Sequence, residues 1–204
     1  MFMPVLASCF ILIIAIAIAG KKGEKSMKDK LEQFQERERV ANEVRRQPID
    51  DLDYLAIPEE FFTFPCDDSS HDAAEARRIL ENLRKEKIVN LTGISNTDLK
   101  LRYGVANLPD LMNFDQNFTS LVRALQMYAE YLNDAGYDKE AVSVLEYAVR
   151  IKSDVSASYR LLGKLYAKAD KCEKIEELIT KARALNSPMS DPIVRSLTAL
   201  TSKA

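Results

Sequence analysis

The chain has little of what most catalytic sites are built from. Its 204 residues include one histidine, three cysteines, six glycines and no tryptophan. The glycines are scattered singly, so the sequence offers no phosphate-binding glycine loop. His71, the only histidine, has no cysteine or second histidine near it in the sequence, which provides neither a zinc ligand set nor a base for a nucleophile. We therefore expect no enzymatic activity, no catalytic residues, no cofactor and no metal site.

Cysteine content and net charge limit the cellular compartment and the kind of partner that we expect. Cys9, Cys66 and Cys172 are odd in number and far apart, which argues against a disulfide framework and fits a reducing compartment. The 29 basic and 31 acidic residues give a formal net charge of -2. A balance so close to neutral argues against a nucleic-acid partner.

Residues 1–20 form a hydrophobic run without a charged side chain. At about 1.5 Å per residue, a helix over this run would just cross a hydrocarbon core of about 30 Å. Lysines follow the run, beginning at Lys21 and Lys22, whereas a signal peptide carries its positive charge before the run. The positive-inside rule then predicts a single-pass signal anchor in the cell membrane, with the C-terminal domain in the cytoplasm. The alternative is a signal peptide cleaved after Ala17-Ile18-Ala19, which would leave a secreted or envelope-facing protein.

Residues 21–46 read as a basic amphipathic helix next to the membrane. Apolar residues recur at threes and fours at Met27, Leu31 and Phe34, and the lysines could attract anionic headgroups at about 1 kcal/mol each. Several glutamates, Glu32 and Glu36 among them, offset this attraction. A solvated spacer helix, or a short coiled-coil pair in a homodimer, therefore remains open.

Residues 47–72 form an acidic, aromatic linker that contains no lysine or arginine. Large apolar side chains such as Ile57, Phe61 and Phe64 lie among its carboxylates. Disordered segments are usually poor in such residues, so we expect this one to lie against another part of the protein.

The stretch 73–115 is predicted to be a helix followed by an irregular segment. Ser70 or Asp72 can cap a helix that runs to about Val89. Glycine, asparagine and proline then punctuate the chain up to Asp115, which indicates turns around a brief helix from about Thr97 to Tyr103.

Within the predicted domain over residues 116–204, the stretch from Leu121 to Leu185 repeats the same residue sizes at a spacing of 34. Small residues recur at Ala129 and Gly163 and at Ala148 and Ala182, and large ones at Leu125 and Tyr159, at Leu132 and Tyr166, and at Leu145 and Ile179. Small residues let two helix backbones approach, and large neighbours fill the grooves beside them.

This pattern resembles the tetratricopeptide repeat (TPR) family, with two repeats over about residues 119–187. The second copy has Tyr159, Leu162, Gly163 and Tyr166 of the first-helix signature, and the first copy has Gly136 at the turn; Asp170 departs from the family by replacing the second turn glycine. The resemblance implies an all-α fold with a short solenoid of helix-turn-helix units. A last helix with Ile193, Leu197 and Leu200 on one face would cap the stack.

The resemblance also implies where a partner binds. In this family the first helices line a concave groove, and the corresponding residues here are Arg123, Gln126, Glu130, Asn133, Arg160, Lys164 and Lys168. A mostly basic groove suits an acidic peptide or a C-terminal carboxylate, although a solvated helix face would carry the same residues. We further hypothesise that Ile49–Phe64 occupies this groove, in cis or in trans within a dimer.

The function expected from the sequence is therefore a membrane-anchored protein-protein interaction scaffold that binds a peptide or protein partner. Besides the secreted protein, a structural subunit of a membrane complex is the alternative.

Overall fold

The computed structural model describes residues 27–67 and 69–201, and this part of the chain is helical, with only an isolated bridge between Tyr54 and Val89. The all-α fold class is therefore confirmed. Within the described ranges, no helix is long and apolar enough to cross a membrane. The membrane helix predicted over residues 1–20 lies outside them. The chain divides into two compact units, one with residues up to Gln47 and Ser95–Leu108, the other with Pro48–Ile94 and Pro109–Ala204.

The smaller unit consists of a helix over residues 27–43, the helix α3 (Asn96–Tyr103) and the short 3-10 helix η2 (Val105–Asn107). Ser95 caps α3 by accepting a hydrogen bond from the Asp98 amide at 3.2 Å. Glu38 of the long helix accepts hydrogen bonds from Lys100 and Thr97 of α3. These bonds hold the pKa of Glu38 below its ordinary value, and they join the two helices across the fully buried Ala41.

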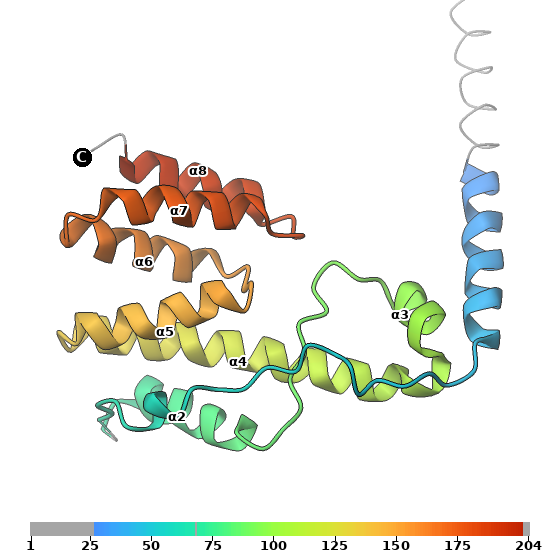
Figure 1. Ribbon diagram of the computed structural model, residues 1–204, viewed down its shortest axis with the longest axis horizontal. Coiled ribbons are helices and arrows are strands. Elements are labelled where there is room, and N and C mark those ends of the chain that lie inside the picture. The colour runs from blue at the N-terminus through green and yellow to red at the C-terminus, as the bar shows by residue number, and fades with distance from the viewer. Residues whose placement is uncertain (1–26, 68, 202–204) are drawn as a thin grey trace, which may run out of the picture. The chain divides into compact units, whose positions relative to one another are not determined.

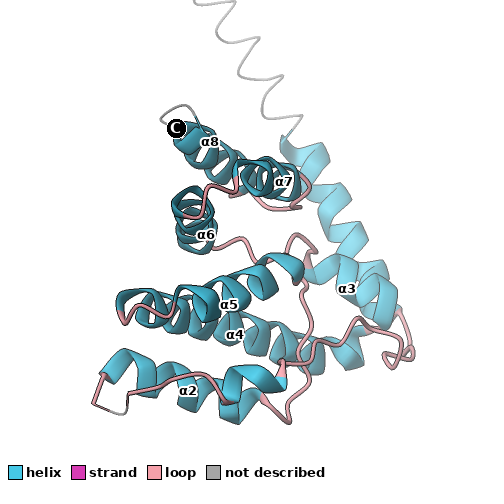
Figure 2. Cartoon of the chain, turned by 60° about the vertical axis from the view of Figure 1, so that its left-hand side comes forward, coloured by secondary structure: helices cyan, strands magenta, loops and turns pink. Residues whose placement is uncertain are grey.

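The larger unit is a layered set of helices (Figures 1 and 2), in which successive helices lie side by side from α2 at one end to α8 at the other. The helices are α2 (His71–Leu83), α4 (Leu108–Asp134, of which Leu108 belongs to the smaller unit), α5 (Asp138–Arg150), α6 (Ser156–Lys168), α7 (Cys172–Arg183) and α8 (Ser190–Thr201). A 3-10 helix, η1 (Glu59–Phe62), precedes them in the acidic segment.

The backbone of this unit repeats at the spacing seen in the sequence. The helices α4 and α6 end 34 residues apart, and α5 and α7 begin 34 residues apart. After α4, the Tyr137 amide donates to the Leu132 carbonyl at 2.7 Å, and after α6 the Lys171 amide donates to the Tyr166 carbonyl at 2.9 Å. Two helix-turn-helix units with matching turns are therefore present, whereas membership of the TPR family stays a prediction.

The size-matched residues of the two units form the core. The pairs Leu125 and Tyr159, and Ala129 and Gly163, are buried in α4 and α6. A β-carbon added at Gly163 would lie 2.9 Å from the side chains of Leu197 and Leu200, so the missing side chain lets α8 approach α6. Ile193 and Leu197 of α8 are fully buried, and α8 thus covers one end of the stack.

Two predicted boundaries are wrong. The helix expected to reach Val89 ends at Leu83, because Ile88 and Val89 turn away and pair with the acidic segment: the Leu55 amide donates to the Ile88 carbonyl at 2.9 Å. The segment predicted to be irregular up to Asp115 is helical from Leu108, because a proline in the first turn, here Pro109, is compatible with a helix start.

The acidic segment packs into the larger unit, but not where we hypothesised. Phe61 is fully buried and its ring centroid lies 5.4 Å from that of Tyr147 on α5. The Tyr147 hydroxyl donates to the Ala56 carbonyl at 2.8 Å, and Ser143 on α5 donates to the Glu60 carboxylate. The part of the segment up to Phe64 therefore lies on α2, α4 and α5, and none of residues 49–64 lines the hollow that contains Arg160 of α6. Burying aromatic side chains contributes more free energy than exposed ion pairs with a basic groove would.

Candidate functional site

A hollow of about 660 Å³ lies on the face where α4 and α6 meet the start of α2. Its floor is made of the half-buried apolar side chains of Met127, Tyr131 and Leu161. We call this the α4–α6 hollow. Its size and mixed lining fit part of a peptide chain.

Four of the seven residues predicted for the groove line this hollow: Glu130, Asn133, Arg160 and Lys164. The two basic residues are exposed and lie one helical turn apart on α6, so their head groups can reach the same ligand. In the described part of the chain, neither forms an ion pair.

The other three predicted residues lie outside the hollow and interact with other parts of the larger unit. Gln126 is 9% exposed and joins the two helices, since its amide accepts a hydrogen bond from Ser158 at 2.5 Å and donates to Glu130 at 2.6 Å. Arg123 lies near α2, where the hydrogen bond from Arg78 lowers the pKa of Glu75 and the charge of Arg123 adds to this effect. Lys168 pairs with Asp138 of α5 at 2.5 Å, at the end of the helix. These three do not line the hollow.

We expected a mostly basic groove, but the hollow has both acidic and basic residues. Asp72 of α2 and Glu130 and Asp134 of α4 form one wall, and Arg160 and Lys164 of α6 form the other. The expectation was wrong because it counted only the residues that the repeat register assigns to the groove. The contribution of α2 depends on a packing that no local sequence signal gives.

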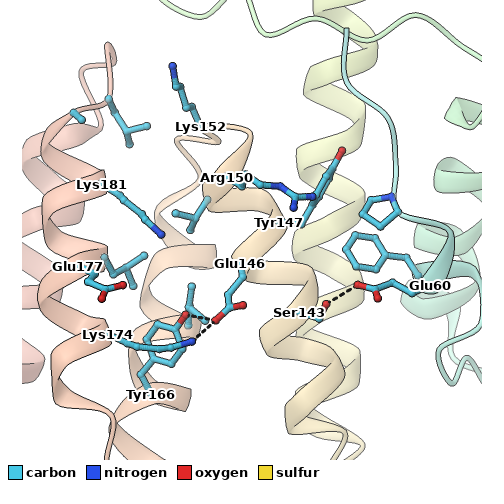
Figure 3. Close-up of a pocket in the computed structure, with 17 residues that line it drawn as sticks. Glu60, Ser143, Glu146, Tyr147, Arg150, Lys152, Tyr166, Lys174, Glu177 and Lys181 are labelled. Carbon is cyan, nitrogen blue, oxygen red and sulfur yellow. Dashed lines mark hydrogen bonds and ion pairs between the residues drawn. The ribbon is translucent and has the colours of Figure 1, made fainter. Parts of the chain in front are cut away.

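A second hollow, of about 610 Å³, lies between α5 and α7 with α6 beneath it (Figure 3), and the acidic segment borders it at Pro58 and Phe61. Glu146 on α5 is the centre of its polar network. The carboxylate accepts hydrogen bonds from the Tyr166 hydroxyl at 2.6 Å and from the Lys174 ammonium at 2.9 Å. Burial alone would raise the pKa of Glu146, but these two bonds outweigh it and hold the pKa below its ordinary value.

Most polar groups of this α5–α7 hollow are therefore bound to one another. Arg150 lies over the Tyr147 ring, 4.9 Å from its centroid, and Glu60 binds Ser143. Lys181 points into the hollow from α7 (Figure 3) and lies two turns from Lys174 on the same helix. Sequence reasoning missed this hollow, although the spacing of the two lysines places them on one face of α7. The bonds that Glu146 forms with Tyr166 and Lys174 favour a structural role for this network.

Neither a histidine nor a cysteine is among the described residues that line the two hollows. Among the residues that the structure describes, no group of three His, Cys, Asp or Glu side chains is placed to hold a metal ion. The side chain of His71 is 91% exposed at the start of α2, beside Asp72. Ion pairing, hydrogen bonding and apolar contact are the interactions that both hollows offer. Searches against protein-family models, curated proteins and solved structures gave no match to this chain.

Proposed function

We propose that this chain is a protein-protein interaction scaffold that binds a peptide of a partner protein in the α4–α6 hollow. The observation that carries the proposal is the pair Arg160 and Lys164. Both are exposed beside a half-buried apolar floor, and neither forms an ion pair with a carboxylate of the described residues. Residues 1–20 would anchor the protein in the cell membrane with this domain on the cytoplasmic side. The resemblance to TPR proteins supports the same function.

The two walls specify what the peptide must carry. An arginine binds a carboxylate with two parallel hydrogen bonds, and a neighbouring ammonium adds charge attraction, so an acidic side chain or C-terminal carboxylate would face α6. An apolar side chain would cover Met127, Tyr131 and Leu161. The opposite wall, with Asp72, Glu130 and Asp134, would repel further acidic groups, so the peptide is acidic along one side only.

A pull-down from detergent extract with the full-length protein tests this proposal. One bait carries Arg160→Glu and Lys164→Glu. A matched control bait carries Lys171→Glu and Arg183→Glu, which make the same change of charge at exposed positions near the ends of α7. We expect a partner that the wild-type and control baits capture and the first bait loses. If all three baits retain the same partners, the α4–α6 hollow is not the binding site.

A further inference from the structure

One face of the helix over residues 27–43 is covered along only half of its length. At about 100° per residue, Met27, Leu31, Phe34, Glu38 and Ala41 fall within an arc of about 80°. The second half of this face packs on α3, where Ala41 is fully buried and Glu38 binds Lys100 and Thr97. In the first half, Met27 is 69%, Leu31 53% and Phe34 57% exposed.

The charged residues around this exposed stripe are sorted by sign. Lys30 lies about 60° to one side of Met27 and Lys28 about 100° to the other. The carboxylates of Asp29, Glu32 and Glu36 lie within about 40° of the opposite side of the helix. The first turns thus have an apolar stripe, basic flanks and an acidic back.

We propose that Met27, Leu31 and Phe34 dock on the surface of an anionic lipid bilayer. Helices that lie in a bilayer interface bury an apolar stripe beneath the headgroups, and flanking lysines reach up to the phosphates with their long side chains. The acidic back then faces water, away from the lipid. The sorting of the charges thus matches a negatively charged surface.

A second copy of the chain fits the same stripe less well. If two such helices paired along Met27, Leu31 and Phe34, the basic flanks of Lys28 and Lys30 would meet the basic flanks of the partner. Like charges beside a helix-helix seam are destabilising. Charge therefore selects the lipid surface over a homodimer.

The position of the stripe in the chain also supports docking on a lipid bilayer. Met27 follows the uncharged run 1–20 by seven residues, which span at most about 25 Å. The inference rests on the proposed membrane anchor, which would hold the stripe close to the headgroups. The interval contains Lys21, Lys22 and Lys25 and one acidic residue, Glu24.

A single tryptophan reports on this face directly, because the chain has none of its own. The full-length Phe34→Trp variant is reconstituted into phosphatidylcholine vesicles with and without phosphatidylglycerol, in which the acyl chains are brominated to quench nearby indoles. The control is Val40→Trp, a position that is 41% exposed and lies about 120° from Phe34 around the helix. We expect the Phe34→Trp protein to lose most of its emission in the anionic vesicles and less in the neutral ones, while the control stays bright.

Other outcomes overturn the proposal. Equal quenching of the two variants, or equal quenching in both kinds of vesicle, would show that the stripe does not bind an anionic surface. A blue-shifted but unquenched Phe34→Trp emission would show that protein, such as a second copy, covers the stripe. Flotation of the same vesicles tests the anchor separately. If the protein floats with the vesicles but its tryptophan is not quenched, the anchor proposal stands and the docking of the stripe is contradicted. If the protein does not float, both proposals are contradicted.

Discussion

Gly136 and Asp170 have the same left-handed backbone conformation at equivalent turns of the two helix-turn-helix units, with φ values of 84° and 58°. Each follows the first helix of its unit and precedes an amide that donates back into that helix. Glycine adopts this conformation at no steric cost, whereas a residue with a β-carbon loses about 1–2 kcal/mol, somewhat less for aspartate. The second turn is therefore the more strained of the two.

Asp170→Gly should raise the free energy of unfolding by up to about 1 kcal/mol, because it removes the β-carbon from a left-handed position. Gly136→Ala should lower it by about 1–2 kcal/mol for the converse reason. Urea unfolding of the full-length protein in detergent, followed by circular dichroism, measures both. The control is Ala169→Gly, whose φ is an ordinary -92° and which should destabilise. If Asp170→Gly lowers the free energy of unfolding as much as this control does, the turn is not strained.

Gly163→Leu should separate α8 from α6. The new side chain would enter the space where Leu197 and Leu200 lie within 2.9 Å of a β-carbon position, and overpacking of this kind costs about 1–3 kcal/mol. We expect faster proteolysis between α7 and α8 and a lower urea midpoint. Ala167→Leu, at an exposed position of α6, is the matched control and should change stability by no more than about 0.5 kcal/mol. Equal proteolysis of the two variants would contradict a close approach of α8 at Gly163.

The helical hairpins could be predicted from the sequence because their signals are local and repeated. Residues of similar size recur 34 positions apart, as at Leu125 and Tyr159 or at Ala129 and Gly163. These residues are buried, as the pattern indicates. The end of α2 could not be predicted. Ile88 and Val89 continue the helical spacing, but pairing with the distant Tyr54 and Leu55 competes with the helix and prevails.

Part of the candidate site could also be predicted from residue spacing along single helices. Spacing along α6 places Arg160 and Lys164 on one face, and the structure brings them together at the α4–α6 hollow. Spacing along α4 also selects Gln126, but only the packed structure shows that Ser158 binds it. The acidic wall contributed by Asp72 depends on how α2 packs, which repeat spacing does not encode.

The protein should unfold in alkali as buried tyrosines ionise. Burial raises the pKa of Tyr128, Tyr147 and Tyr159 to about 12, above the ordinary value of about 10. A folded-state pKa above the unfolded one contributes stability below pH 10 that is lost as the pH rises towards 12. Absorbance at 295 nm should therefore show exposed tyrosines ionising first and the buried ones together with loss of helical circular dichroism.

Two tyrosine variants check the cause of this alkaline transition. Tyr159→Phe removes a buried hydroxyl that has no hydrogen-bond partner among the residues that the structure describes, and it should move the unfolding midpoint to higher pH. Tyr137→Phe, at a side chain that is 40% exposed, should leave the midpoint unchanged. A transition that both variants shift equally would not arise from burial of the phenol groups.

Arg77 should be the residue that holds the acidic segment on the helices. Its guanidinium donates to the Phe64 carbonyl at 2.7 Å and to the Tyr128 hydroxyl at 2.8 Å, and it also donates to the Phe62 carbonyl. Arg77→Met would leave the Phe62 carbonyl without this donor, at about 1–3 kcal/mol if the carbonyl stays buried. The Phe64 carbonyl would keep only the longer bond from the Tyr128 hydroxyl, at 3.2 Å. We expect faster chymotrypsin cleavage next to Phe62 and Phe64 and a lower urea midpoint.

Arg78→Met is the matched control for Arg77→Met, because that neighbouring side chain is 64% exposed and, among the described residues, pairs only with Glu75 on the same helix. It should leave the cleavage rate near that of the wild type. Arg77→Lys should not restore protection, since a single ammonium cannot replace a planar fork that binds several acceptors at once. If chymotrypsin cleaves the Arg77 and Arg78 variants at the same rate, the buried aromatic rings alone hold the segment, and the guanidinium contacts contribute nothing to its attachment.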